Sequence, residues 1–185
     1  LKKNVQTTLP FVYFPLHQEV ERALLLGAPF HTNQLENIKN VSKSLPIGYK
    51  LIVKEHPNMK YRGWRSIGEM KQIMSIPNVE FVHPSTNNLD LIKKSQLVFT
   101  INGSASVEAA MYGKPSIILA NTGPFELPSM HKVSSWDDLP FSIRKYLNEK
   151  VKNDDILRFV NAVEKNSIIF DDQKILLDFH DIFYE

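Results

Sequence analysis

The sequence of 185 residues contains no cysteine, which excludes a disulfide framework, a thiolate zinc site and a cysteine nucleophile. No apolar run approaches the roughly 20 residues that a membrane-spanning helix needs, and no hydrophobic region typical of a signal peptide follows the first residues. Neither sign of charge dominates, since 22 Lys and Arg stand against 20 Asp and Glu for a net charge of +2. That balance argues against bulk electrostatic attraction to nucleic acid or to an anionic membrane. We therefore expect no nucleic-acid partner and no transmembrane segment.

Two glycine motifs are also missing, because neither GxGxxG nor GxxxxGK[ST] occurs. Their absence disfavours an ordinary dinucleotide-binding domain and a P-loop NTPase. The spacing of His, Asp and Glu matches no metal site. We therefore expect no metal ion and no resident cofactor.

Short apolar runs alternate with helical patterns along the chain. The runs read as five strands, at 11–14, 50–54, 79–82, 97–101 and 116–120, with helical stripes between them. The runs are continuous rather than alternating, which is typical of a parallel sheet that is covered on both faces. Right-handed crossovers then predict an α/β, doubly wound, Rossmann-like sheet of about five to six strands, in the order 3-2-1-4-5.

We expect a single Rossmann-like domain over residues 1–185, with its core at 10–120 and a C-terminal loop and helices at 121–185. Apolar residues at 156, 159, 160 and 163 predict one of those helices, and Ile175 to Phe183 is apolar enough for a terminal one. The sequence starts with Leu1 rather than Met, so we expect a piece of a longer protein.

Polar side chains follow three of the predicted strands. His17 and Glu21 follow the first strand, His56 follows the second, and Asn102 to Ser106 follow the fourth. Ligands of open parallel sheets bind beyond the carboxyl ends of the strands, where the strand order reverses. The three loops are therefore predicted to meet in one crevice.

The segment after the fourth strand has the pattern of an anion site. Gly103 permits a tight turn, and Ser104 and Ser106 open a helix whose free N–H groups attract anions. Glu108 lies one turn beyond Ser104, where a carboxylate can accept hydrogen bonds from sugar hydroxyls. The alternative is structural: Ser104 caps the helix and Glu108 complements its dipole.

The second strand ends in Lys54, Glu55, His56 and Pro57. Pro57 favours an extended conformation for His56, whose imidazole can donate a hydrogen bond to a phosphate. The alternative is a solvated histidine at a strand end, since His83 and Pro84 repeat the same dipeptide without a matching site. His17 and Glu21 are candidate acid or base groups, although loop carboxylates are often only solvated.

A basic stretch, with Lys60, Arg62 and Arg65, follows the second strand. Its cations can contact a phosphate, but we expect a solvated loop.

Taken in order, four motifs resemble one family. They are Phe14-Pro15-Leu16-His17, Lys54-Glu55-His56-Pro57, Gly103-Ser104-Ala105-Ser106-Val107-Glu108-Ala109 and Gly113-Lys114-Pro115. This combination resembles the nucleotide-binding, C-terminal half of capsular polysaccharide biosynthesis proteins, GT-B-type glycosyltransferases that include the capsule Kdo transferases. The resemblance covers roughly residues 10 to 120.

The resemblance implies a role for each matching residue. His56 would contact the donor phosphate and assist departure of the nucleotide, and Ser104 and Ser106 would hold that phosphate. Glu108 would face the ribose or the sugar, while His17 and Glu21 would lie beside the donor. The other donor-binding residues would be Lys54, Glu55, Pro57, Asn102 and Gly103. Family members often carry proline before the glutamate of the first loop, whereas Val20 precedes Glu21 here.

The implied function is transfer of a sugar from a nucleotide-activated, CMP-linked donor to a saccharide or glycolipid acceptor. The N-terminal acceptor domain would be absent from this chain, which would bind nucleotide weakly and transfer nothing alone. The implied location is the cytoplasm, with peripheral association at the inner face of the plasma membrane. Alternatives are a polyol-phosphate transferase, a nucleotide-sugar epimerase domain and a non-catalytic Rossmann-like binding module.

Overall fold

The computed structural model describes the chain except for residues 2–4, 6, 19–21, 63–64, 121–126 and 168–185. Its centre is a six-stranded, all-parallel sheet in the order β3-β2-β1-β4-β5-β6. The strands are β1 (Phe11–Pro15), β2 (Lys50–Lys54), β3 (Val79–Val82), β4 (Leu97–Thr100), β5 (Ser116–Ile118) and β6 (Met130–Lys132). The predicted α/β, Rossmann-like class and the strand order are therefore confirmed.

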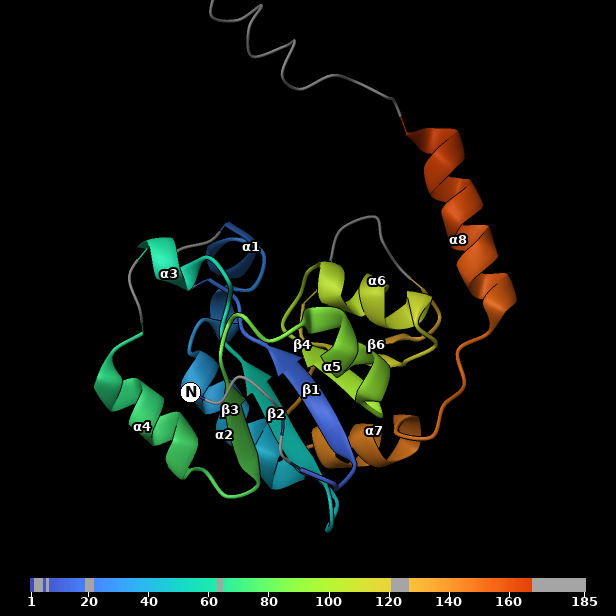
Figure 1. Cartoon of the computed structure of the whole chain (residues 1–185). Coiled ribbons are helices and arrows are strands. Elements are labelled where there is room, and N and C mark those ends of the chain that lie inside the picture. Colours follow the sequence, from blue (N-terminus) through green and yellow to red (C-terminus); the bar gives the residue numbers. More distant parts are fainter. Residues whose placement is uncertain (2–4, 6, 19–21, 63–64, 121–126, 168–185) are drawn as a thin grey trace, which may run out of the picture.

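Helices connect the strands and cover both faces of the sheet (Figure 1). They are α1 (Arg22–Leu25), the 3-10 turn η1 (Pro29–His31), α2 (Gln34–Ser44), α3 (Met59–Arg62), α4 (Ile67–Ser75), α5 (Asn88–Lys94), α6 (Ser104–Met111), α7 (Leu139–Tyr146) and α8 (Asn153–Asn166). Helices α2, α4 and α7 pack on one face, and α5 and α6 pack on the other. The two short helices α1 and α3 lie within the connections that follow β1 and β2.

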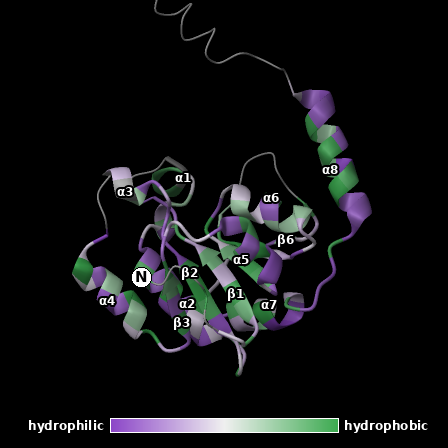
Figure 2. Ribbon diagram, viewed as in Figure 1, coloured by the Kyte–Doolittle hydropathy of each residue, from purple (hydrophilic) through white to green (hydrophobic). Residues whose placement is uncertain are grey.

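Alternating side chains of the strands build a core on each face of the sheet. Phe14 and Phe99 meet edge to face on the α2 side, with ring centroids 4.9 Å apart. Tyr13 and Val98, one residue earlier in each strand, belong to the cluster under α5 and α6. Both faces are buried, which is why the strands read as continuous apolar runs. Figure 2 shows the resulting concentration of hydrophobic residues in the central strands.

The sixth strand, β6, was not placed by the sequence. Its three residues, Met130, His131 and Lys132, are half-buried or exposed, so they form no apolar run. Backbone pairing with β5 defines this strand, in the register Ile117↔His131. His131 also stacks on Tyr146 with the ring centroids 3.4 Å apart and contacts Glu149.

The helix at 153–166 is confirmed as α8, and none of its residues is buried. Hydrophilic and hydrophobic residues follow one another along it (Figure 2). No helix in the described part of the chain is long and apolar enough to cross a bilayer. The terminal helix predicted at 175–183 lies outside the described residues.

Candidate functional site

A cavity of about 310 Å³ lies at the carboxyl ends of β1, β2 and β4. The ends of these strands and the loops that follow them supply most of its wall, and α5 and α6 supply the rest. Its lining consists of Tyr13, Pro15, Leu16, His17, Lys54, Glu55, His56, Pro57, Asn88, Thr100, Asn102, Gly103, Ser104, Ala105 and Glu108. The structure thus brings His17, His56 and Ser104 to one cavity from three separate loops.

His17 is held from both its backbone and its ring. Its backbone N–H donates to Oε1 of Gln34 at 2.8 Å, and its carbonyl accepts from Nε2 of the same amide at 2.9 Å. Gln34 is the first residue of α2, whose N-cap Asn33 accepts from the Glu36 N–H at 3.1 Å. At the other end, Nε2 of His17 lies 3.3 Å from Oγ1 of Thr100.

Gly103 allows the loop after β4 to approach this ring. Its backbone has φ +102° and ψ −175°, a conformation that is essentially restricted to glycine. A Cβ atom at this position would lie 3.3 Å from Cε1 of His17. The glycine therefore serves both the turn and the close approach to the imidazole.

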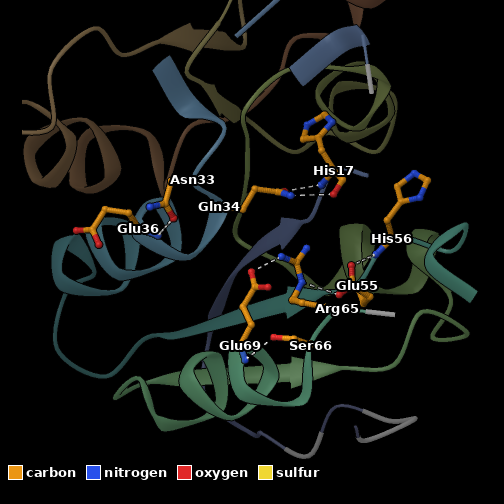
Figure 3. A network of polar contacts seen from close by, with 9 residues as sticks. All are labelled: His17, Asn33, Gln34, Glu36, Glu55, His56, Arg65, Ser66 and Glu69. Atoms are coloured by element: carbon orange, nitrogen blue, oxygen red, sulfur yellow. Dashed lines mark hydrogen bonds and ion pairs between the residues drawn. The ribbon is translucent and has the colours of Figure 1, made fainter. Parts of the chain in front are cut away.

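His56 presents a defined tautomer. Its Nδ1 accepts a hydrogen bond from the backbone N–H of Asn58 at 3.2 Å, so in the neutral ring the proton resides on Nε2. Figure 3 shows the imidazoles of His17 and His56 extending to the same side, beyond the Glu55–Arg65 pair. His56 can therefore donate an N–H hydrogen bond to a ligand oxygen.

A buried ion pair between Glu55 and Arg65 holds the backbone of His56. The carboxylate of Glu55 accepts from the His56 backbone N–H at 2.8 Å and from Nε of Arg65 at 2.9 Å, and both charged side chains are fully buried. Arg65 also contacts Glu69 at 2.5 Å. The expectation that Arg65 lies in a solvated loop is therefore wrong, because its guanidinium neutralises a carboxylate under the site. The side chains of Lys60 and Arg62 lie outside the described residues.

The helix α6 starts at the cavity, and no side chain of the described residues caps its first turn. Ser104 is exposed there, and its hydroxyl donates to Oε1 of Glu108 at 3.0 Å. Ser106 is fully buried instead, and its hydroxyl donates to the carbonyl of Gly103 at 2.9 Å. The two serines are therefore placed differently: Ser104 lines the cavity and Ser106 braces the turn.

Two residues that the sequence did not single out complete this wall. Asn88 donates from Nδ2 to Oε2 of Glu108 at 2.9 Å, and the hydroxyl of Tyr13 donates to Oδ1 of Asn88. Burial, and next the charge of Glu108, raise the pKa of Tyr13 well above its usual range, so the phenol stays protonated as a donor. A tyrosine in the middle of a buried strand was the available signal, since a buried hydroxyl needs a partner.

Lys54 is only 5% exposed at the floor of the cavity. Burial lowers the pKa of its ammonium, and the nearby carboxylate of Glu108 opposes that shift. Pro57 and Asn102 also line the cavity.

Of the other candidates, Glu21 lies outside the described residues. His83 forms a local turn, in which Nδ1 accepts from the Ser85 backbone N–H at 3.1 Å. Within the described residues, no group of three or more His, Asp and Glu side chains could hold a metal ion.

Comparison with known proteins identifies structures of similar architecture. No protein-family model and no curated protein matches the sequence. The β-Kdo 2,7-transferase KpsC of Thermosulfurimonas dismutans superposes with a TM-score of 0.55 and 17% identity, over 84% of this chain and 46% of that one. The UDP-GlcNAc 2-epimerase of Methanocaldococcus jannaschii gives 0.55 and 19%, over 85% and 46%. Staphylococcus aureus MnaA, solved with UDP, gives 0.52 and 17%, over 80% and 41%.

These similarities concern the fold, and the chain spans less than half the length of each of these structures. Most of this chain superposes on one part of each neighbour. The chain therefore has the Rossmann-like fold of one half of a GT-B protein, as its motifs predicted.

Proposed function

We propose that this chain is the donor-binding domain of a glycosyltransferase of capsule or surface-polysaccharide biosynthesis, and that its cavity holds the nucleotide of a CMP-linked sugar donor. The observation that carries the proposal is the meeting of His17, His56 and Ser104 at one cavity, at the start of α6. A GT-B neighbour that is a Kdo transferase supports the same assignment.

His56 is the group proposed to face the leaving phosphate. Its Nε2 carries the proton when Nδ1 accepts from Asn58, so it can donate to a phosphate oxygen as negative charge grows there. The open first turn of α6 adds N–H donors and the positive end of the helix dipole. Donors that are already in place cost little reorganisation during the reaction, which is how such sites stabilise developing charge.

Glu108 is proposed to recognise a hydroxyl of the ribose or the sugar. Each of its oxygens already accepts one hydrogen bond, from Ser104 and from Asn88, and a carboxylate oxygen can accept more than one. A phosphate would be repelled by this carboxylate, whereas a hydroxyl donor would be attracted.

The acceptor saccharide or glycolipid is proposed to bind between this chain and a second domain. Transfer requires an acceptor hydroxyl to be aligned with the anomeric carbon and deprotonated. We expect the second domain to supply that base, and we expect no transfer by this chain alone. The proposed setting is the cytoplasmic face of the plasma membrane.

Calorimetric titration with CMP, CDP and UDP tests the proposal. We expect CMP to bind more tightly than UDP, and His56→Ala and Ser104→Ala each to weaken CMP by about tenfold, the effect of one hydrogen bond to a charged group. His83→Ala is the matched control, because His83 also precedes a proline but lies in a turn of its own. Binding that is unchanged in both site variants would refute the proposal.

A second candidate function is a nucleotide-sugar epimerase domain, which the similarity to two UDP-related structures favours. Preference for UDP over CMP in the same titration would support it. Preference for CDP would favour the polyol-phosphate transferase instead. Absence of nucleotide binding at millimolar concentration would favour a non-catalytic binding module.

A further inference from the structure

The end of β2 sends two opposite charges to opposite faces of the sheet. Lys54 and Glu55 are neighbours, and successive side chains of a strand alternate between faces. Glu55 meets Arg65, which lies just before α4 on one face. Lys54 lies two residues after Ile52 and therefore on the same face of the sheet, where Ile52 packs in one hydrophobic cluster with Tyr13. The ammonium of Lys54 also interacts electrostatically with Glu108 on α6. The carboxylate is therefore paired within the protein, and the ammonium is directed to the cavity side.

The ammonium of Lys54 has no such pairing. The side chain is 5% exposed, and across the described residues no acceptor lies within hydrogen-bond distance of its Nζ. Glu108 attracts it through space, but the two oxygens of that carboxylate are held by Ser104 and Asn88. A buried charge without a partner is costly, so Lys54 is a cation kept ready for an acceptor.

The serine hydroxyls do not compete for the same acceptor in this arrangement. The hydrogen of Ser104 goes to Glu108, and the hydrogen of Ser106 goes to the Gly103 carbonyl. Ser104 can therefore donate to an anion only by releasing Glu108, whereas among the described residues the ammonium of Lys54 has no such acceptor to release. An anion in the cavity would find its charged donor at Lys54.

We propose that Lys54 binds an oxyanion of the ligand and sets the preference of this cavity for acidic ligands. The inference deepens the proposed function and rests on it in taking the oxyanion as the nucleotide phosphate. Lys54 and Glu108 then serve different groups of one ligand, the ammonium a phosphate and the carboxylate a hydroxyl. The backbone N–H groups of α6 and the Nε2–H of His56 complete the phosphate site.

Calorimetric titration of the whole chain with CMP, cytidine, inorganic phosphate and glucuronate tests this assignment. The variants are Lys54→Met, which keeps the length of the stem without charge, and Lys54→Gln as a second neutral form. Lys50→Met is the matched control, because Lys50 is the first residue of the same strand, at its amino end. Circular dichroism verifies that each variant is folded.

We expect both neutral variants to weaken CMP by about 10- to 100-fold, the range for a lost hydrogen bond between charged groups. Cytidine is expected to bind the wild type and the variants equally, and Lys50→Met is expected to bind CMP like the wild type. Lys54-dependent binding of glucuronate without binding of CMP or phosphate would assign the oxyanion to a sugar carboxylate and overturn the phosphate assignment.

The remaining outcomes separate this inference from the proposed function. CMP binding that depends on His56 but not on Lys54 would overturn the inference and leave the proposed function standing. Lys54-dependent binding of inorganic phosphate without any nucleotide binding would support the inference and overturn the function. Binding of none of the four probes would overturn both.

Discussion

Replacing Gly103 by alanine perturbs the turn and the site at once. The residue has φ +102° and ψ −175°, which costs about 1–3 kcal/mol for a residue with a Cβ atom. The new Cβ would also lie 3.3 Å from Cε1 of His17. The backbone of His17 cannot retreat easily, because Gln34 holds it by hydrogen bonds of 2.8 and 2.9 Å, but the imidazole can rotate. The ring, rather than the loop, is expected to move.

These values set the expected size of the effect. In a chain of this length 1 kcal/mol changes Tm by about 2–4 °C, so Gly103→Ala is expected to lower Tm by about 2–12 °C. Displacement of His17 and of the first turn of α6 is expected to weaken CMP by about tenfold, the equivalent of one hydrogen bond at the site. Thermal denaturation and calorimetric titration measure the two effects.

Gly48→Ala is the control that separates strain from contact. Gly48 also has a positive φ, +89°, but no atom lies within 4 Å of the position that its Cβ would take. We expect a loss of stability in both variants and a loss of CMP binding only in Gly103→Ala. Unchanged stability and binding in Gly103→Ala, or equal losses of binding in the two variants, would refute the reasoning.

Three other predictions concern charge and burial. Arg65→Met leaves Glu55 buried without its partner, so we expect a loss of about 3–5 kcal/mol, and roughly 10 °C in Tm, on thermal denaturation; a Tm close to wild type would show that the pair is dispensable. Lys54→Met is expected to be more stable than the wild type at neutral pH, because it removes an unpaired buried charge. Burial lowers the pKa of Lys54, so with rising pH the folded state releases a proton that the unfolded chain still keeps. The difference in Tm between Lys54→Met and the wild type should therefore shrink between about pH 7 and pH 10. A difference that widens over this range would contradict the prediction. Burial also lowers the pKa of His31, whose Nδ1 is buried with no hydrogen-bond partner among the described residues. Wild-type stability is therefore expected to fall as the pH drops from about 7 to 5, because the unfolded chain gains the proton more readily than the folded one. His31→Phe should flatten that fall in pH-dependent denaturation. Equal slopes of stability against pH in the wild type and the variant would show that His31 does not titrate differently in the two states.

Most of the sheet could be predicted because its strands are buried on both faces. A continuous apolar run such as Leu51-Ile52-Val53 identifies such a strand without any knowledge of its neighbours. The strand β6 has no run of this kind, since pairing of Ile117 with His131 defines it. Its existence depends on the register of two segments and is invisible to a local pattern.

The candidate site also has a part that could be predicted from the sequence and a part that could not. The topological rule for parallel sheets was sufficient to bring the loops of His17, His56 and Ser104 to one edge. The supporting partners required tertiary pairings that no spacing reveals, such as the contact of Tyr13 with Asn88, 75 residues away. Arg65 was misjudged for the same reason, because only the folded chain shows that Glu55 is buried beside it.

The account depends on one claim, that a phosphate-bearing nucleotide occupies the cavity at the carboxyl ends of β1, β2 and β4. NMR chemical-shift mapping during a CMP titration tests it most directly. The account predicts saturable shifts that are largest at the amides of residues 102–106 and 54–57 and at the His17 and His56 rings, with little change at the opposite edge around Gly48. Saturable shifts centred elsewhere on the chain, with these residues unmoved, would contradict it.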